Sequence, residues 1–228
     1  MERKQIMLKN ISKSSQIIGA LGLITILVMS LSAGVTPLSI ITLVGGLTGF
    51  ASVVLIVNRS WWAGAMGIIS AVSYIYVALV AQNPSDAILN VLFLLVLDLP
   101  IVFNKDWQED TAPKSITGKQ GLVLFVVIVV AFLGLHFMEV YLTHSPRAFW
   151  SPLAASLGIT ASVATSFMRV KQSFIIWTAQ NILQVVLWSI TASMGDATWT
   201  MAIVYMFYTV NALSSFTNGK WFAKKEVA

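Results

Sequence analysis

The sequence contains no cysteine, only two histidines and few charged residues. Without cysteine, disulfide bonds, thiolate nucleophiles and cysteine-ligated metals are excluded, and His136 and His144 alone do not make a convincing metal centre. Charged residues form 10% and hydrophobic residues 57% of the 228 residues, and the mean hydropathy of +0.82 lies far outside the range of soluble domains. We therefore expect an integral membrane protein without a cofactor. We expect no nucleic-acid partner, because no soluble module carries the net charge of +5.

Eight long apolar runs account for most of the chain. They cover Gln16 to Ser32, Leu38 to Val57, Trp61 to Ala81, Asp86 to Phe103, Gly121 to Leu142, Phe149 to Met168, Phe174 to Met194 and Ala197 to Phe216. Each is close to the ~20 residues that a helix needs to cross a bilayer, and the strict alternation of a barrel strand is missing. The sequence predicts an all-α integral membrane fold of eight transmembrane helices. The first is expected to be an uncleaved helix, since its apolar stretch is long for a signal peptide core.

The basic residues predict the orientation in the bilayer. All of them except Arg147 fall in the two terminal segments or in loops on the same side, which contain Arg59, Lys105 to Lys119, and Arg169 to Lys171. Short loops rich in lysine and arginine remain in the cytoplasm. We therefore expect a multi-pass membrane protein with both termini in the cytoplasm.

A weak internal repeat relates the two halves of the chain. Six residues recur in order 110 positions later, as Ala51, Ser52, Val53, Arg59, Asp86 and Ala87 and again as Ala161, Ser162, Val163, Arg169, Asp196 and Ala197. A single linking helix between three-helix copies lets both copies enter the membrane in the same direction, as in transporters built from parallel repeats. The prediction is one transmembrane domain with an amino-terminal segment and accessory helix (1–36), a first repeat (37–103), a loop and linking helix (104–148), a second repeat (149–221) and a tail (222–228).

Polar side chains are concentrated in the seventh run. Trp177, Gln180, Asn181, Gln184 and Trp188 are spaced so that all five lie on one face of a helix. One interpretation is that the amides only hydrogen-bond neighbouring helices. We favour a binding site, because carboxamides offer a donor and an acceptor together while indoles supply stacking faces. A planar, nitrogen-rich ligand would fit such a wall.

Other runs supply further candidates for the same site. The eighth run contributes Tyr205, Tyr208 and Asn211, the third contributes Trp62 and Tyr74 by analogy with the seventh, and the fourth contributes Asn90 and Asp98. A carboxylate inside a bilayer is energetically costly, so the presence of Asp98 indicates a specific partner or function. Three hypotheses remain for it: a pair with a basic group near the inner surface, a hydrogen bond to a tyrosine or asparagine across the repeat interface, or contact with a ligand or proton.

These segments together resemble the Pnu family of vitamin transporters. The resemblance rests on Asn58 to Tyr74 (NRSWWAGAMGIISAVSY), on Trp177 followed by Asn181, and on the end from Tyr205 through Gly219 to Trp221. It implies a 3+1+3 core related to the SWEET transporters, and facilitated diffusion without an energy source. It also implies a homotrimer, and trapping of the substrate by a cytoplasmic kinase that forms no stable complex with the transporter.

The expected substrate follows from a departure from the family pattern. Relatives that carry nicotinamide riboside commonly show a second tryptophan where this chain has Gln180. Because a carboxamide suits a neutral base edge better than a cation, the sequence favours a nucleoside or deoxynucleoside. Nicotinamide riboside is the alternative, and thiamine a weaker one. An enzyme is excluded, since no catalytic constellation lies at one membrane depth, whereas a ligand-sensing receptor without transport stays open.

Overall fold

The computed structural model describes residues 11–104, 107, 113–218 and 220–222, and these residues form helices and no strand. The helices are α2 (Lys13–Ser32), α3 (Pro37–Val57), α4 (Trp62–Val80), α5 (Pro84–Leu92), η1 (Phe93–Asp98), α6 (Leu99–Phe103), α8 (Gly118–Met138), η2 (Glu139–Thr143), α9 (Trp150–Ser166), α10 (Ser173–Ser193) and α11 (Thr200–Asn218). The two η elements are π-helical, and α5, η1 and α6 follow one another without a break. Residues 1–10, 105–106, 108–112, 219 and 223–228 lie outside the described residues.

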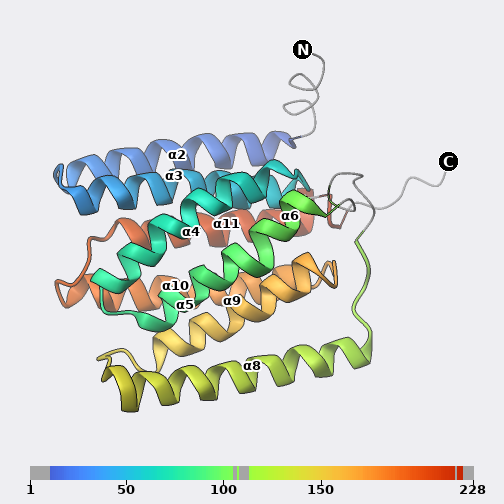
Figure 1. Cartoon of the computed structure of the whole chain (residues 1–228). Helices are drawn as coiled ribbons and strands as arrows, with labels where there is room; N and C mark the ends of the chain where they lie inside the picture. The colour runs from blue at the N-terminus through green and yellow to red at the C-terminus, as the bar shows by residue number, and fades with distance from the viewer. Residues whose placement is uncertain (1–10, 105–106, 108–112, 219, 223–228) are drawn as a thin grey trace.

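The helices run side by side in one bundle, with α2 and α3 at one edge and α8 at the other (Figure 1). Six described helical segments are long and apolar enough to cross a membrane: Lys13–Ser32, Pro37–Val57, Trp62–Val80, Pro84–Phe103, Gly118–Thr143 and Ser173–Ser193. The helix α9 has only 17 residues and buries most of them inside the bundle, so it presents little apolar surface to lipid. The predicted all-α, multi-pass membrane fold is confirmed, and every predicted run coincides with a helix or an unbroken helical segment.

Local sequence explains where several helices begin. Thr36 and Ser39 form a capping box in front of α3, and Thr117 and Gln120 form another in front of α8. Proline occupies the first helical position of α3 and of α5, where a missing N–H costs nothing. These start signals place α5 and α8 two and three residues ahead of the apolar runs that predicted them.

The π-helical turn η1 has an identifiable cause. Pro100 lacks the N–H that would bond the carbonyl of Val96 four residues earlier. The Ser166 hydroxyl of α9 donates to that carbonyl instead, at 2.6 Å. Such π-helical turns often occur at functional sites, because they change the direction of a side chain. Here the altered turn ends at Asp98.

The backbone turns recur between the two halves of the chain. Residues with positive φ occur at Gly34 and His144 and at Arg59 and Arg169, each pair 110 positions apart, and at Gln82 and Gly195, 113 apart. The packing is also reciprocal: α3 contacts α4 and α11, while α9 contacts α10, α5 and η1. Both observations support an internal repeat in which the first helix of each copy packs against the third helix of the other.

Candidate binding cavity

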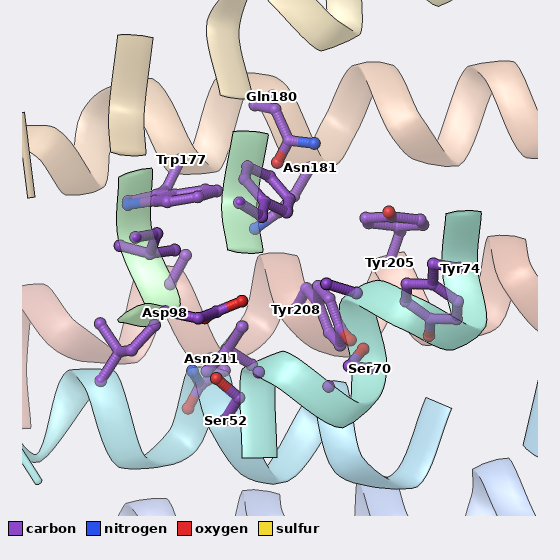
Figure 2. Close-up of a pocket in the computed structure, with 18 of the residues that line it drawn as sticks. Ser52, Ser70, Tyr74, Asp98, Trp177, Gln180, Asn181, Tyr205, Tyr208 and Asn211 are labelled. Atoms are coloured by element: carbon purple, nitrogen blue, oxygen red, sulfur yellow. The ribbon is translucent and has the colours of Figure 1, made fainter. Parts of the chain in front are cut away.

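A cavity lies inside the bundle between α3, α4, η1, α10 and α11, with the end of α5 at its edge (Figure 2). It contains about 690 Å³ of space that atoms do not fill, part of it open to solvent. Its wall is formed by Gly49, Ser52, Val53, Ile56, Gly67, Ser70, Ala71, Tyr74, Asn90, Phe93, Leu97, Asp98, Phe174, Trp177, Gln180, Asn181, Tyr205, Tyr208, Asn211 and Ala212.

Nine of the twelve residues predicted from the sequence lie in this wall. They are Trp177, Gln180, Asn181, Tyr205, Tyr208, Asn211, Tyr74, Asn90 and Asp98. The structure therefore brings together side chains from four helical segments: α4, the unbroken α5–η1 segment, α10 and α11.

Three predicted residues lie outside the wall. The Gln184 amide donates to the carboxylate of Asp86, and Trp188 is fully buried in the apolar cluster beyond the cavity. They share the predicted face of α10 with Gln180, but each further turn adds about 5.4 Å along the axis, and the face extends past the end of the cavity. Trp62 stacks on Trp61 at the start of α4, with ring centroids 4.4 Å apart.

Several polar atoms of the buried wall side chains lack hydrogen-bond partners among the described residues. They are both amide atoms of Gln180 and the side-chain oxygen of Asn211. Buried polar groups are normally paired, because leaving one unpaired costs about 1–3 kcal/mol. A ligand with complementary donors and acceptors would satisfy these atoms, and the Gln180 amide offers one of each.

The Trp177 indole is held in a fixed orientation. Its Nε1 donates to the Thr165 hydroxyl at 2.8 Å, and its ring lies 5.5 Å from that of Phe93 at an interplanar angle of 53°. Thr165 comes from α9 and was not among the residues predicted for the site. Figure 2 shows the indole on the same side of the cavity as Gln180 and Asn181. The wall thus combines an aromatic face with amide groups on one helix.

Asp98 lies at the end of η1 and lines the cavity although the residue is only 3% exposed. Within the described part of the chain, its carboxylate has no ion pair and no hydrogen bond, so neither of the two structural hypotheses for it finds a matching contact. A methyl group on Gly67 would lie 2.0 Å from Oδ1 of this carboxylate. The glycine therefore makes room for the acid, and the carboxyl group faces the cavity.

The sequence also missed the small residues of the wall. A Cβ atom on Gly49 would lie 2.1 Å from the Tyr208 hydroxyl and 2.4 Å from that of Ser70. The only signal at this position was the spacing of Gly45 and Gly49, which is typical of close helix packing. In the structure the missing side chain of Gly49 leaves room for the hydroxyl groups of Ser70 from α4 and Tyr208 from α11.

An all-helical membrane protein with an internal cavity of polar and aromatic side chains has the architecture of a small-molecule transporter. The family model described as "Nicotinamide mononucleotide transporter" matches residues 39–222, and the chain belongs to this family. It is a transporter and not an enzyme.

A solved structure shows the same fold. The chain is similar to the protein of the "Crystal structure of the Vitamin B3 transporter PnuC", with a TM-score of 0.72, 21% sequence identity and 89% of each chain covered. A comparison with curated proteins finds no match. The predicted membership of the Pnu family is confirmed, and the comparisons favour the nicotinamide alternative over the deoxynucleoside substrate.

Proposed function

We propose that this protein transports a nicotinamide-bearing nucleoside, such as nicotinamide riboside, by facilitated diffusion. The observation that carries the proposal is the combination of an unpartnered Gln180 amide, the Trp177 indole and the Asp98 carboxylate in one cavity. A nicotinamide nucleoside presents a positively charged pyridinium ring and a primary carboxamide. The indole face and the carboxylate suit the cation, and the Gln180 amide suits the carboxamide.

The charge of the wall favours the nucleoside over its phosphorylated form. A phosphate monoester carries a charge of about −1.5 to −2 at neutral pH and needs cationic partners. The described wall contains Asp98 and neither lysine, arginine nor histidine. A mononucleotide would therefore bring its phosphate next to a carboxylate without compensation.

A neutral nucleoside or deoxynucleoside is the second candidate. It is favoured by one observation, the carboxamide of Gln180 at the position where nicotinamide riboside carriers of the family commonly have a second tryptophan. Both amide atoms of this side chain are free of described partners and could pair with the edge of a base. The two candidate substrates differ in charge, so replacing Asp98 should affect the binding of one more than that of the other.

The remaining parts of the proposal concern how transport occurs. The sequence contains no nucleotide-binding P-loop, so we propose a uniporter that alternates access between the two sides through its 3+1+3 parallel repeat. A cytoplasmic kinase would trap the substrate. We further propose a homotrimer in the bacterial cytoplasmic membrane with both termini inside, as the basic residues predict.

Counterflow in liposomes tests this function. Purified protein is reconstituted into vesicles loaded with unlabelled nicotinamide riboside, and uptake of the labelled compound is measured with competing nicotinamide mononucleotide, nicotinic acid riboside, thymidine or thiamine. We expect efficient counterflow and weak competition by all four. Strong competition by thymidine with no uptake of nicotinamide riboside would replace the first candidate with the second, while binding without equilibration into the lumen would indicate a receptor.

The Gln180→Leu variant tests the residue that carries the proposal. It should weaken nicotinamide riboside uptake by about tenfold, since the carboxamide loses its partners. The matched control is Ile182→Ala on the same helix, where the side chain is exposed on the outside of the bundle. Equal uptake by the two variants would contradict the proposed role of the amide.

A further inference from the structure

Arg147 is the exception to the charge pattern, because it is the one basic residue predicted on the outer side. It lies in the loop between η2 and α9 and is 2% exposed. Its Nη1 donates to Asp196 at 2.7 Å and its Nε to the Asn83 side-chain oxygen at 2.6 Å, while Nη2 donates to the carbonyls of Ala81 and Gln82. A guanidinium with this many fixed partners is a structural element and not a surface charge.

The partners belong to two loops that occupy corresponding places in the two halves of the chain. Residues 81–83 connect α4 to α5, and Asp196 lies in the connection between α10 and α11. Both loops turn through a residue with positive φ, Gln82 in the first and Gly195 in the second. Arg147 therefore joins the two halves at the end of the bundle opposite to the start of α2 (Figure 1).

An apolar cluster lies between this junction and the cavity. It includes Tyr74, Val77, Ala81, Trp188, Met201 and Tyr205, all of them buried. Tyr74 and Tyr205 also belong to the cavity wall, so the cluster closes the outer end of the cavity. A solute arriving from this side must separate α4 and α5 from α10 and α11, and such a separation pulls the partners of Arg147 apart.

We propose that Arg147, with residues 81–83 and Asp196, forms the outer gate of the transporter. The bonds of the guanidinium hold the gate closed, and their release is a step of substrate entry. This inference rests on the alternating access of the proposed function, though not on the identity of the substrate. The bond to Asp196 is the easiest of these to break, because the Asp196 side chain is 31% exposed and water can take its place.

Cysteine accessibility tests the outer gate, because the chain contains no native cysteine. The Ala71→Cys variant places one thiol on the cavity wall, and a membrane-impermeant thiol reagent is added to right-side-out or inside-out vesicles. In this background, Asp196→Asn should raise the labelling rate from outside about tenfold and lower the rate from inside. Arg147→Gln should have a larger effect in the same direction, and Arg147→Lys an intermediate one.

Opposite changes on the two sides identify a gate, since a shifted equilibrium gains one state at the expense of the other. Asp196→Asn should add little once Arg147 is replaced, because the two residues act through one bond. Faster labelling from both sides would indicate general loosening, and unchanged labelling would show that another contact closes the outer end. Either result would overturn the proposal. Labelling requires no substrate, so a wrong substrate assignment would leave this test unaffected.

Discussion

Replacing Asp98 with asparagine tests whether the cavity is built for a cation. The variant keeps the shape of the side chain and removes its charge. In the structure this carboxylate is buried, lines the cavity and has no ion pair within the described residues. The carboxyl group is therefore available to a ligand, and if it acts as a counter-ion the substitution should affect charged and neutral ligands differently.

The size of the effect can be worked from Coulomb's law. A pyridinium nitrogen about 5 Å from the carboxylate, at an effective dielectric constant of about 20, is attracted by about 3 kcal/mol. Because the ligand loses part of its hydration on entry, we expect the variant to lose about 2–3 kcal/mol of binding free energy, or roughly 30- to 150-fold in affinity. A neutral nucleoside should change by less than about threefold, since an asparagine can still form hydrogen bonds.

The assay is equilibrium binding to purified protein by titration calorimetry, alongside the concentration dependence of counterflow. Nicotinamide riboside and thymidine are compared in the wild-type protein and in Asp98→Asn. Thermal unfolding of the variant provides the control for folding. Equal losses for the two ligands, or an unchanged affinity for nicotinamide riboside, would refute the reasoning that Asp98 acts as a counter-ion.

Two further predictions concern the groups that position the wall. Gly67→Ala would place a methyl group 2.0 Å from the Asp98 carboxylate, so we expect binding to weaken at least tenfold and stability to fall by about 1–3 kcal/mol. Gly134→Ala on α8 meets no atom within 4 Å and should stabilise the helix by up to about 1 kcal/mol without affecting transport; similar transport by both variants would contradict this prediction. Thr165→Val removes the 2.8 Å bond to Trp177 and should raise the KM about fivefold, about 1 kcal/mol, with recovery in Thr165→Ser. A normal KM in the valine variant would show that another contact orients the indole.

The helices were predictable because their pattern is local. A segment inside a bilayer must pair its own backbone N–H and C=O groups, so a run of about 20 apolar residues forms a helix. The third run, Trp61 to Ala81, differs from α4 (Trp62–Val80) by one residue at each end. The interruption at η1 was not predicted, because it depends on a hydroxyl from α9 as well as on Pro100.

The sequence predicted which face of α10 is polar, but not how far along that face the cavity extends. The helical period places Gln180, Gln184 and Trp188 on one face of α10, and the structure agrees that all are buried. Which of them reaches the cavity depends on the packing of other helices. The Gln184 amide donates to Asp86 of α5 and does not line the cavity. The Gln180 side chain lies in the cavity wall.

By itself, the sequence determined the class of the protein, its helices and the polar face of α10, since composition and periodicity act over one or two turns. Only the tertiary structure decided what the charged residues do. Asp98 was one carboxylate with three possible partners until η1 and Gly67 placed it in the cavity wall. Arg147 was an exception to a rule until its bonds to Asn83 and Asp196 joined two distant loops. The partners of a buried charge are chosen by contacts between helices, and such contacts leave no periodic trace in the sequence.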